Sequence, residues 1–329
     1  MHPHPYDTLT PDTVLDALSS VGLHGDGRLT ALNSYENRVY LVHLEDDSAV
    51  VTKFYRPGRW TPEQIEEEHA FALALAEAEV PVVAPLRLQG RTLHRYGGFA
   101  FSISPRRGGR PPELDDPEVL EWIGRFLARL HLVGARAPFT HRPALDIPRL
   151  GRVPMDELLT RGLIPAEART RWCSAAEAAL QAVEAAWART PFLALRLHGD
   201  CHPGNILWAP TDRPGGGPHF VDLDDACTGP AVQDLWMLLS GNRAQQQHQL
   251  GALLDGYETL RPFDRRELAL IEPLRTLRLI HYSAWLARRW DDPTFPIHFP
   301  WFGSGSYWLE QAQTLWDQVA SMEDEPLVA

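Results

Sequence analysis

The chain has 329 residues, of which 44% are hydrophobic and 22% charged, a composition typical of a globular protein long enough for two lobes or domains. Its formal net charge of −12 argues against a general nucleic-acid binder, because the phosphate backbone would repel such a surface. With no apolar run near the roughly 20 residues that span a bilayer, no secretory pattern at the start and three cysteines without metal-type spacing, we expect a cytoplasmic protein with reduced thiols and no membrane partner.

The first part of the chain reads as a small sheet preceded by a helix, which starts at Thr10 and Pro11. We expect strands over residues 29–32, 38–44 and 49–55. The turn at residues 33–37 would be a phosphate-covering loop, although it contains no glycine, and Ser34 would offer a hydroxyl or backbone N–H to a phosphate oxygen. An ordinary hairpin turn of hydrogen-bonding residues is the alternative for Ser34.

One cation stands out, because the chain contains 31 lysines and arginines together and only Lys53 is a lysine. Lysine carries a compact ammonium on a slim stem, whereas arginine carries a wide planar fork. Lys53 lies in an apolar strand, as does the lysine of the Val-Ala-Ile-Lys element of kinases. We therefore expect Lys53 to contact nucleotide phosphates; chance survival of one lysine in an arginine-biased sequence is the alternative.

A capping-box pattern at residues 61–64 predicts a helix that continues to about residue 79. Glu68 falls inside the apolar stripe of this helix, where an unpaired carboxylate is costly. We therefore expect Glu68 to pair with Lys53. A shift of one residue in the helix would give this place to Glu67.

Three short strands and a segment rich in prolines and glycines follow. We expect the strands over residues 82–87, 91–95 and 99–104. The breakers at residues 105–110 predict an interlobe hinge. Backbone groups near Ile103 and Ser104 would then contact the adenine of ATP.

The hinge divides the chain into two expected lobes, an N-terminal nucleotide-binding lobe over residues 1–104 and a C-terminal catalytic and substrate lobe over residues 111–329. The second lobe should be mostly helical, beginning with a long amphipathic helix over residues 116–132. An aromatic-rich stretch at residues 290–308 reads as a substrate lip or as core.

The polar run from His198 to Asn205, followed seventeen residues later by Asp222, is typical of phosphoryl transfer. Asp200 would orient the attacking hydroxyl and accept its proton. The amide oxygen of Asn205 and the carboxylate of Asp222 would hold Mg²⁺ against the nucleotide phosphates. Apolar residues before Asp200 and around a glycine-rich turn predict short strands at residues 206–208 and 220–221.

With these residues in place, the chain resembles the aminoglycoside phosphotransferase and choline kinase branch of the protein-kinase-like fold. In that branch His-Gly-Asp replaces His-Arg-Asp and Asp-x-Asp replaces Asp-Phe-Gly, as at residues 197–205 and 221–225 here. A longer similarity, to the bacterial stress response kinase A group of cytoplasmic serine/threonine protein kinases, is carried by residues 34–40, 54–60 and 220–239. The resemblance implies a bilobal α+β fold with a small sheet lobe and a larger helical lobe.

The resemblance also implies the reaction and the residues that perform it. A monomer would use ATP and Mg²⁺ to phosphorylate serine or threonine hydroxyls of proteins in a bacterial stress response. The implied site consists of the proton acceptor Asp200, the essential metal ligand Asp222, the second ligand Asn205, the phosphate contact Lys53 with its partner Glu68, and the ATP-site residue Ser34. Asp224 and Asp225 stay open between metal support and capping, and Asp234 would anchor the catalytic loop.

Three other functions compete with this interpretation. A small-molecule kinase would keep the same residues and act on an amino alcohol, a homoserine-like compound or an aminoglycoside. A metal hydrolase would use His198, Asp200, Cys201 and His202, but Pro203 breaks the helical spacing that zinc proteases need. A nucleotide-binding scaffold would bind ATP without transferring phosphate.

Overall fold

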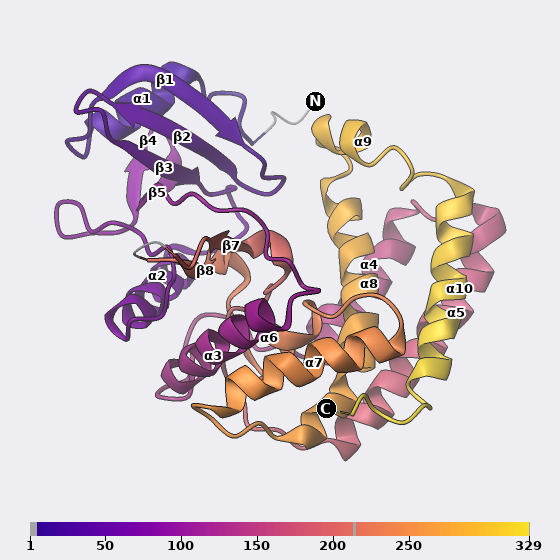
Figure 1. The fold of residues 1–329 in the computed structure, drawn as a ribbon. Coiled ribbons are helices and arrows are strands. Elements are labelled where there is room, and N and C mark those ends of the chain that lie inside the picture. Colours follow the sequence, from indigo (N-terminus) through magenta and orange to yellow (C-terminus); the bar gives the residue numbers. More distant parts are fainter. Residues whose placement is uncertain (1–4, 213–214, 329) are drawn as a thin grey trace.

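A five-stranded antiparallel sheet forms the N-terminal part of the structure (Figure 1). The computed structural model describes residues 5–212 and 215–328. The strand order is β1-β2-β3-β5-β4, with bounds Gly25–Leu32 (β1), Arg38–Leu44 (β2), Ala49–Phe54 (β3), His94–Tyr96 (β4) and Phe99–Pro105 (β5). Two helices belong to this part, α1 (Pro11–Ser19) and α2 (Pro62–Glu77).

Strand β3 explains why Lys53 faces away from the sheet's own core. Burial alternates along β3, with Val50, Thr52 and Phe54 buried, so the side chain of Lys53 lies on the opposite face. Phe54 stacks on Phe101 of β5 in the apolar core that α1 covers.

Both predicted helix starts are confirmed. Thr10 caps α1 by accepting a hydrogen bond from the Thr13 backbone N–H. At α2 the Gln64 N–H donates to Thr61 Oγ1 at 3.3 Å, and the Thr61 N–H donates to Gln64 Oε1 at 2.9 Å. This reciprocal capping box satisfies two N–H groups that a helix end otherwise leaves without partners.

The expected strand over residues 82–87 is wrong. Its backbone makes single hydrogen bonds, from Val83 N to Phe220 O at 2.9 Å and from Leu86 N to Ile103 O at 2.7 Å. Pro85 lies between them and has no N–H to continue a ladder. The strand expected at residues 91–95 begins later, at His94.

Helices make up most of the chain after the sheet (Figure 1). They are α3 (Pro117–Gly134), α4 (Val153–Arg161), α5 (Ala166–Arg189), α6 (Gln233–Trp236), α7 (Arg243–Glu258), α8 (Ile271–Arg289), α9 (Thr294–His298) and α10 (Gly305–Ser321). Short turns of π-helix (η1, Pro148–Arg152) and 3₁₀-helix (η2, Pro203–Asn205; η3, Leu223–Asp225; η4, Arg265–Leu270) connect them. Among the residues described, no helix is long and apolar enough to cross a membrane.

Two small antiparallel sheets lie among these helices and carry the polar motif. Strand β6 (Leu195–Leu197) pairs with β9 (Cys227–Gly229), and β7 (Ile206–Ala209) pairs with β8 (Gly217–Phe220). Phe220 N also donates to Pro81 O at 2.8 Å, which ties β8 to the segment after α2. The predicted hairpin before Asp222 is therefore confirmed, and its second strand is anchored to the N-terminal part.

The aromatic-rich stretch at residues 290–308 is mostly core. Phe295, Phe302 and Trp308 are fully buried against α5 and α8. Trp301 and Ile297 remain exposed, with 41% and 75% of their surface accessible.

Candidate active site

Hydrogen bonds to Asp234 fix the loop that carries Asp200. His198 N and Gly199 N each donate to the Asp234 carboxylate at 2.8 Å. The neighbouring Gln233 Nε2 donates to Gly199 O, also at 2.8 Å. The predicted anchoring role of Asp234 is confirmed.

Gly199 is needed at this point of the loop because its φ is +86° and a Cβ there would collide with the Asp225 carbonyl oxygen. The loop therefore touches the backbone that follows Asp222. This contact through Gly199 fixes the distance between the loop that carries Asp200 and the segment that carries Asp224 and Asp225.

Asp234 has a second support that the sequence reasoning missed, His131 at the end of α3. His131 Nε2 lies 3.1 Å from Asp234 Oδ2, and His131 Nδ1 lies 2.8 Å from the Tyr257 hydroxyl. Burial alone would raise the pKa of Asp234, but the hydrogen bond and charge of His131 hold it below its usual value. The helical pattern over residues 116–132 gives no sign of these distant contacts.

Asp200 forms an ion pair that no sequence motif indicated. Its Oδ1 accepts a hydrogen bond from Arg278 NH1 of α8 at 2.6 Å, and its Oδ2 lies 3.5 Å from His202 Nε2. Arg278 therefore orients the Asp200 carboxylate at the edge of the loop.

Asn205 and Asp222 are joined to this loop through the backbone. Asn205 Nδ2 donates to Asp200 O at 3.0 Å, and Val221 N donates to Asn205 O at 3.0 Å. His198 Nε2 lies 2.9 Å from Val221 O and therefore braces β8 against the loop. His198 is occupied in this bracing and Cys201 is fully buried, which leaves neither side chain available for the hydrolase alternative.

Asp222 forms an ion pair with Lys53 of strand β3. Lys53 Nζ donates to Asp222 Oδ1 at 2.6 Å, and about half of the Asp222 side chain remains exposed. Asp222 has φ 59° and ψ 64°, a left-handed conformation that costs a residue with a Cβ about 1 kcal/mol or more. This backbone turn directs the carboxylate of Asp222 toward Lys53.

Glu68 lies close enough to interact electrostatically with Lys53 but is not its ion-pair partner in this structure. Burial raises the pKa of Glu68 to about 7, against the opposing charge of Lys53. Within the described part of the chain, Asp222 is the one carboxylate within 4.0 Å of Lys53 Nζ. Glu67 instead accepts hydrogen bonds from three consecutive backbone N–H groups, those of Thr140, His141 and Arg142.

The remaining predicted nucleotide-site residues lie in the β1–β2 turn and in strand β5. Ser34 is half-buried in the turn between β1 and β2. Ile103 is buried opposite Thr52, and its carbonyl already accepts a hydrogen bond from Leu86 N, whereas Ser104 is partly exposed at the end of β5.

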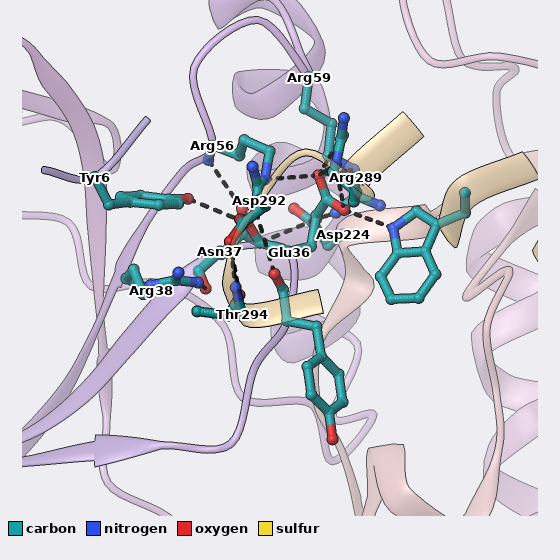
Figure 2. Close-up of polar contacts among 12 residues, drawn as sticks. Tyr6, Glu36, Asn37, Arg38, Arg56, Arg59, Asp224, Arg289, Asp292 and Thr294 are labelled. Carbon is teal, nitrogen blue, oxygen red and sulfur yellow. Dashed lines mark hydrogen bonds and ion pairs between the residues drawn. The ribbon is translucent and has the colours of Figure 1, made fainter. Parts of the chain in front are cut away.

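Figure 2 shows a cluster of buried charges, here called the interlobe cluster, that joins the β1–β2 turn to α8. Glu36 is its centre: it pairs with Arg289 NH2 at 2.6 Å and with Arg56 Nε at 3.2 Å, and accepts from Trp285 Nε1 at 2.6 Å. Arg56 also reaches Asp292 at 3.1 Å. The turn that holds Ser34 is therefore attached to the helical part of the molecule.

The interlobe cluster also contains Asp224 and Asp225, for which the sequence left metal support or capping open. Asp224 accepts from Asn37 Nδ2 at 3.1 Å and pairs with Arg59, and Asp225 pairs with Arg59 NH2 at 2.7 Å. Burial would raise the pKa of Asp224, but Arg59, Lys53 and Arg142 hold it well below the usual range. Both carboxylates therefore connect the two parts of the molecule.

Comparison with known proteins gives this geometry a context. Residues 28–271 match the family described as the phosphotransferase enzyme family (APH). A Salmonella paratyphi A protein named stress response kinase A is 48% identical over 322 residues, which cover 98% of this chain and 96% of that protein. A Salmonella typhimurium protein named serine/threonine protein kinase RdoA is likewise 48% identical over 322 residues, with 98% and 96% covered.

The fold is also found among solved structures. The amicoumacin kinase hAmiN, solved with AMP-PNP, Ca²⁺ and its ligand, superposes with a TM-score of 0.70 at 17% identity, covering 98% of this chain and 96% of that one. The predicted bilobal α+β fold is thereby confirmed, and so is the resemblance to the stress response kinase A group. The matching region of 28–271 and the 48% identity over nearly the whole length show that this chain belongs to the phosphotransferase enzyme family and is a kinase.

Proposed function

We propose that the protein transfers the γ-phosphoryl group of ATP to serine or threonine hydroxyls of proteins, in a bacterial stress response. The observation that carries the proposal is the position of the Asp200 carboxylate, which lies on the loop that Asp234 fixes and that also bears Asn205. The names of the 48% identical relatives support the acceptor class and the stress role.

Asp200 would accept the proton of the acceptor hydroxyl. A general base must lie within hydrogen-bond reach of that hydroxyl and must be ionised at the working pH. Arg278 NH1 lies 2.6 Å from Asp200 Oδ1 and so orients this carboxylate. Positioning and charge neutralisation supply most of the catalysis in phosphoryl transfer, so a carboxylate held on a rigid loop suits the reaction.

The residues present fit a divalent cation such as Mg²⁺. With its amide N–H directed to Asp200 O, Asn205 has its Oδ1 available, and Asp222 exposes about half of its side chain. Two oxygen ligands suit Mg²⁺, which keeps several waters and takes further ligands from nucleotide phosphates. When bound, the cation would neutralise charge on the transferred group.

The nucleotide would lie between the sheet and the helical part. Lys53 would contact the phosphates with Glu68 beside it, and the turn at Ser34 would cover them. Adenine would meet the chain at Ile103, whose carbonyl already accepts a hydrogen bond from Leu86 N, and at Ser104, which is partly exposed near the end of β5. We further propose that residues 105–110 act as a hinge between lobes at residues 1–104 and 111–329.

Replacing Asp200 tests the proposed chemistry. Asp200→Asn should lower the rate of phosphate transfer by roughly 100- to 10 000-fold, because it removes the proton acceptor, while nucleotide affinity should change little. The measurement uses γ-labelled ATP with the protein alone, with a mixture of unrelated proteins and with a panel of amino alcohols, beside nucleotide binding by calorimetry.

Each arm of that experiment separates one alternative. Labelled phosphoserine or phosphothreonine supports the proposal, and label on the small alcohols alone would replace it with a small-molecule kinase. Equal transfer by parent and Asp200→Asn would contradict the role of Asp200. Binding of ATP with no transfer by the parent would indicate a scaffold.

A further inference from the structure

One face of α8 borders the catalytic loop and is rich in cationic groups. Arg278 on this face holds Asp200, and His281 follows three residues later, on the same side of the helix. The π-helical turn η1 packs on α8 at this level, since a Cβ on Gly151 would lie 2.9 Å from Leu277 Cδ2. The turn therefore brings Arg149 to the same region.

Arg149 differs from the other arginines around it. Arg142 donates to the carbonyl oxygens of Ala226 and Asp224, and Arg288 pairs with Glu157 at 2.7 Å. For the half-buried guanidinium of Arg149, the described residues supply neither a hydrogen bond nor an ion pair. Burial lowers its pKa, and the nearby charges of Asp225 and Asp146 offset this effect only in part.

His281 belongs to the same group. It is half-buried, and no hydrogen-bond partner for its ring is found within the described ranges. Burial lowers its pKa to about 4, and the charges of Arg288, Arg149 and Arg278 add to this effect while Asp225 opposes it. The ring is therefore neutral at physiological pH and has one N–H to donate. Hydrogen-bond donors therefore gather here: the guanidinium of Arg149, the guanidinium of Arg278, which binds Asp200, and the N–H of His281. The described residues do not supply hydrogen-bond acceptors for all of them.

We propose that Arg149, Arg278 and His281 bind an acidic side chain of the protein acceptor, close to the hydroxyl that is phosphorylated. This inference rests on the proposed serine/threonine kinase function. Guanidinium groups bind carboxylates in a planar, often bidentate geometry, and such charge-assisted bonds are stronger than neutral ones.

Geometry limits where the acidic residue lies in the acceptor. Arg278 is 2.6 Å from the Asp200 carboxylate that must receive the hydroxyl proton. An extended peptide advances about 3.3 Å per residue, so the acidic side chain should lie within about three residues of the serine or threonine. The net charge of −12 does not oppose this, because charges beyond a Debye length of about 8 Å are screened at physiological salt.

The test compares three peptides that differ at the positions flanking one serine, carrying Asp, Ala or Lys. The parent enzyme should phosphorylate the Asp peptide with a kcat/KM about tenfold or more above the Ala peptide, as expected for one charge-assisted contact. Arg149→Met should bring this ratio close to one. Arg149→Glu should reverse the preference in favour of the Lys peptide, a result that a folding defect alone does not produce.

Arg171→Met is the matched control, because it removes the same charge from an exposed position of α5 for which the described residues supply no hydrogen bond or ion pair. It should keep both the rate and the peptide preference of the parent. Equal or better phosphorylation of the Ala and Lys peptides by the parent would overturn the proposed subsite. Free serine and homoserine form a further arm, and their phosphorylation in place of all peptides would overturn both the subsite for a protein segment and the protein kinase function.

Discussion

Two buried carboxylates near the loop that carries Asp200 have pKa values shifted in opposite directions because their partners differ. Asp234 receives two backbone N–H groups and the His131 ring, so its pKa is below the usual value. Glu267 in η4 accepts a hydrogen bond from Val232 N at 3.0 Å and forms no ion pair with the residues that the structure describes. Burial therefore raises the pKa of Glu267 to about 7. The surroundings of Asp234 favour its ionised form, which supports the loop, whereas burial favours the neutral form of Glu267.

Glu267 gives a prediction for the pH dependence of stability. Between its unfolded value of 4.5 and about 7, the folded protein keeps Glu267 protonated while the unfolded chain ionises it. Unfolding then releases a proton, so this group's contribution to the free energy of unfolding falls as pH rises through that window and is constant above it. Glu267→Gln should gain stability relative to the parent by on the order of 3 kcal/mol across the window.

Urea unfolding of parent and Glu267→Gln at a series of pH values measures this gain. Glu310→Gln, on the exposed side of α10, should reproduce the pH profile of the parent. A difference between parent and Glu267→Gln that stays constant with pH would show that Glu267 is ionised throughout.

At the level of elements, α3 and α7 approach each other through glycines. A Cβ on Gly124 would collide with the Leu253 carbonyl oxygen, and one on Gly256 would collide with the Glu121 carbonyl oxygen. Since α3 also supplies His131, this close contact helps to position the support of the catalytic loop. The distance between α3 and α7 therefore affects where His131 supports Asp234.

Gly256→Ala should destabilise the fold by about 1–3 kcal/mol, because the two backbones must move apart to admit a methyl group. Thermal or urea unfolding measures the loss. Gly251→Ala in the same helix is the control: its Cβ would meet nothing within 4 Å, so it should raise stability by a few tenths to about 1 kcal/mol through helix propensity. If both variants changed stability equally, the contact at Gly256 would not limit helix spacing.

Elements with local signals were predictable from the sequence. The capping box at Thr61 and Gln64 and the Thr10 cap of α1 each involve residues within a few positions, and both are present. The segment at residues 82–87 misled because its apolar residues suggest a strand while Pro85 prevents a ladder. Local pattern describes a residue's chemistry but not its distant partner.

The residues of the candidate site also differ in whether a local sequence pattern predicts them. Motif spacing proposed Asp200, Asn205, Asp222 and Lys53, whose side chains or backbones the structure links to one another or to the same loop. It did not indicate Arg278, which is 78 residues from Asp200 in sequence, because the helical pattern of α8 carries no sign of that contact. The partner expected for Lys53 differed for the same reason: helix phase places Glu68 inside, but tertiary contacts decide which carboxylate is nearest.

For the whole molecule, the interlobe cluster sets how the sheet meets the helices. Glu36 contacts Arg289 and Trp285 of α8, so the turn with Ser34 is held toward the helical part (Figure 2). A buried charge cluster is costly to disturb, because the loss of one member leaves the others unpaired.

Glu36→Gln should lower the free energy of unfolding by roughly 3 kcal/mol, because Arg56 and Arg289 would lose their shared partner. It should also raise the KM for ATP, because a released β1–β2 turn covers the phosphates less firmly. Urea unfolding and initial rates at varied ATP measure the two effects. Glu66→Gln on the exposed face of α2 removes the same charge and should change neither quantity; an unchanged KM in Glu36→Gln would show that the attachment does not shape the nucleotide site.

Lys53 is the sole lysine of the chain, and it lies at the meeting point of the sheet and Asp222. The protein therefore carries one side-chain primary amine, and it is placed where the nucleotide is proposed to sit. Burial alone would lower the pKa of this amine, but Asp222 and Asp224 keep it protonated. Amine-directed reagents, which report on many surface positions in most proteins, have a single side-chain target here, and its modification at alkaline pH would report on access to the proposed nucleotide site.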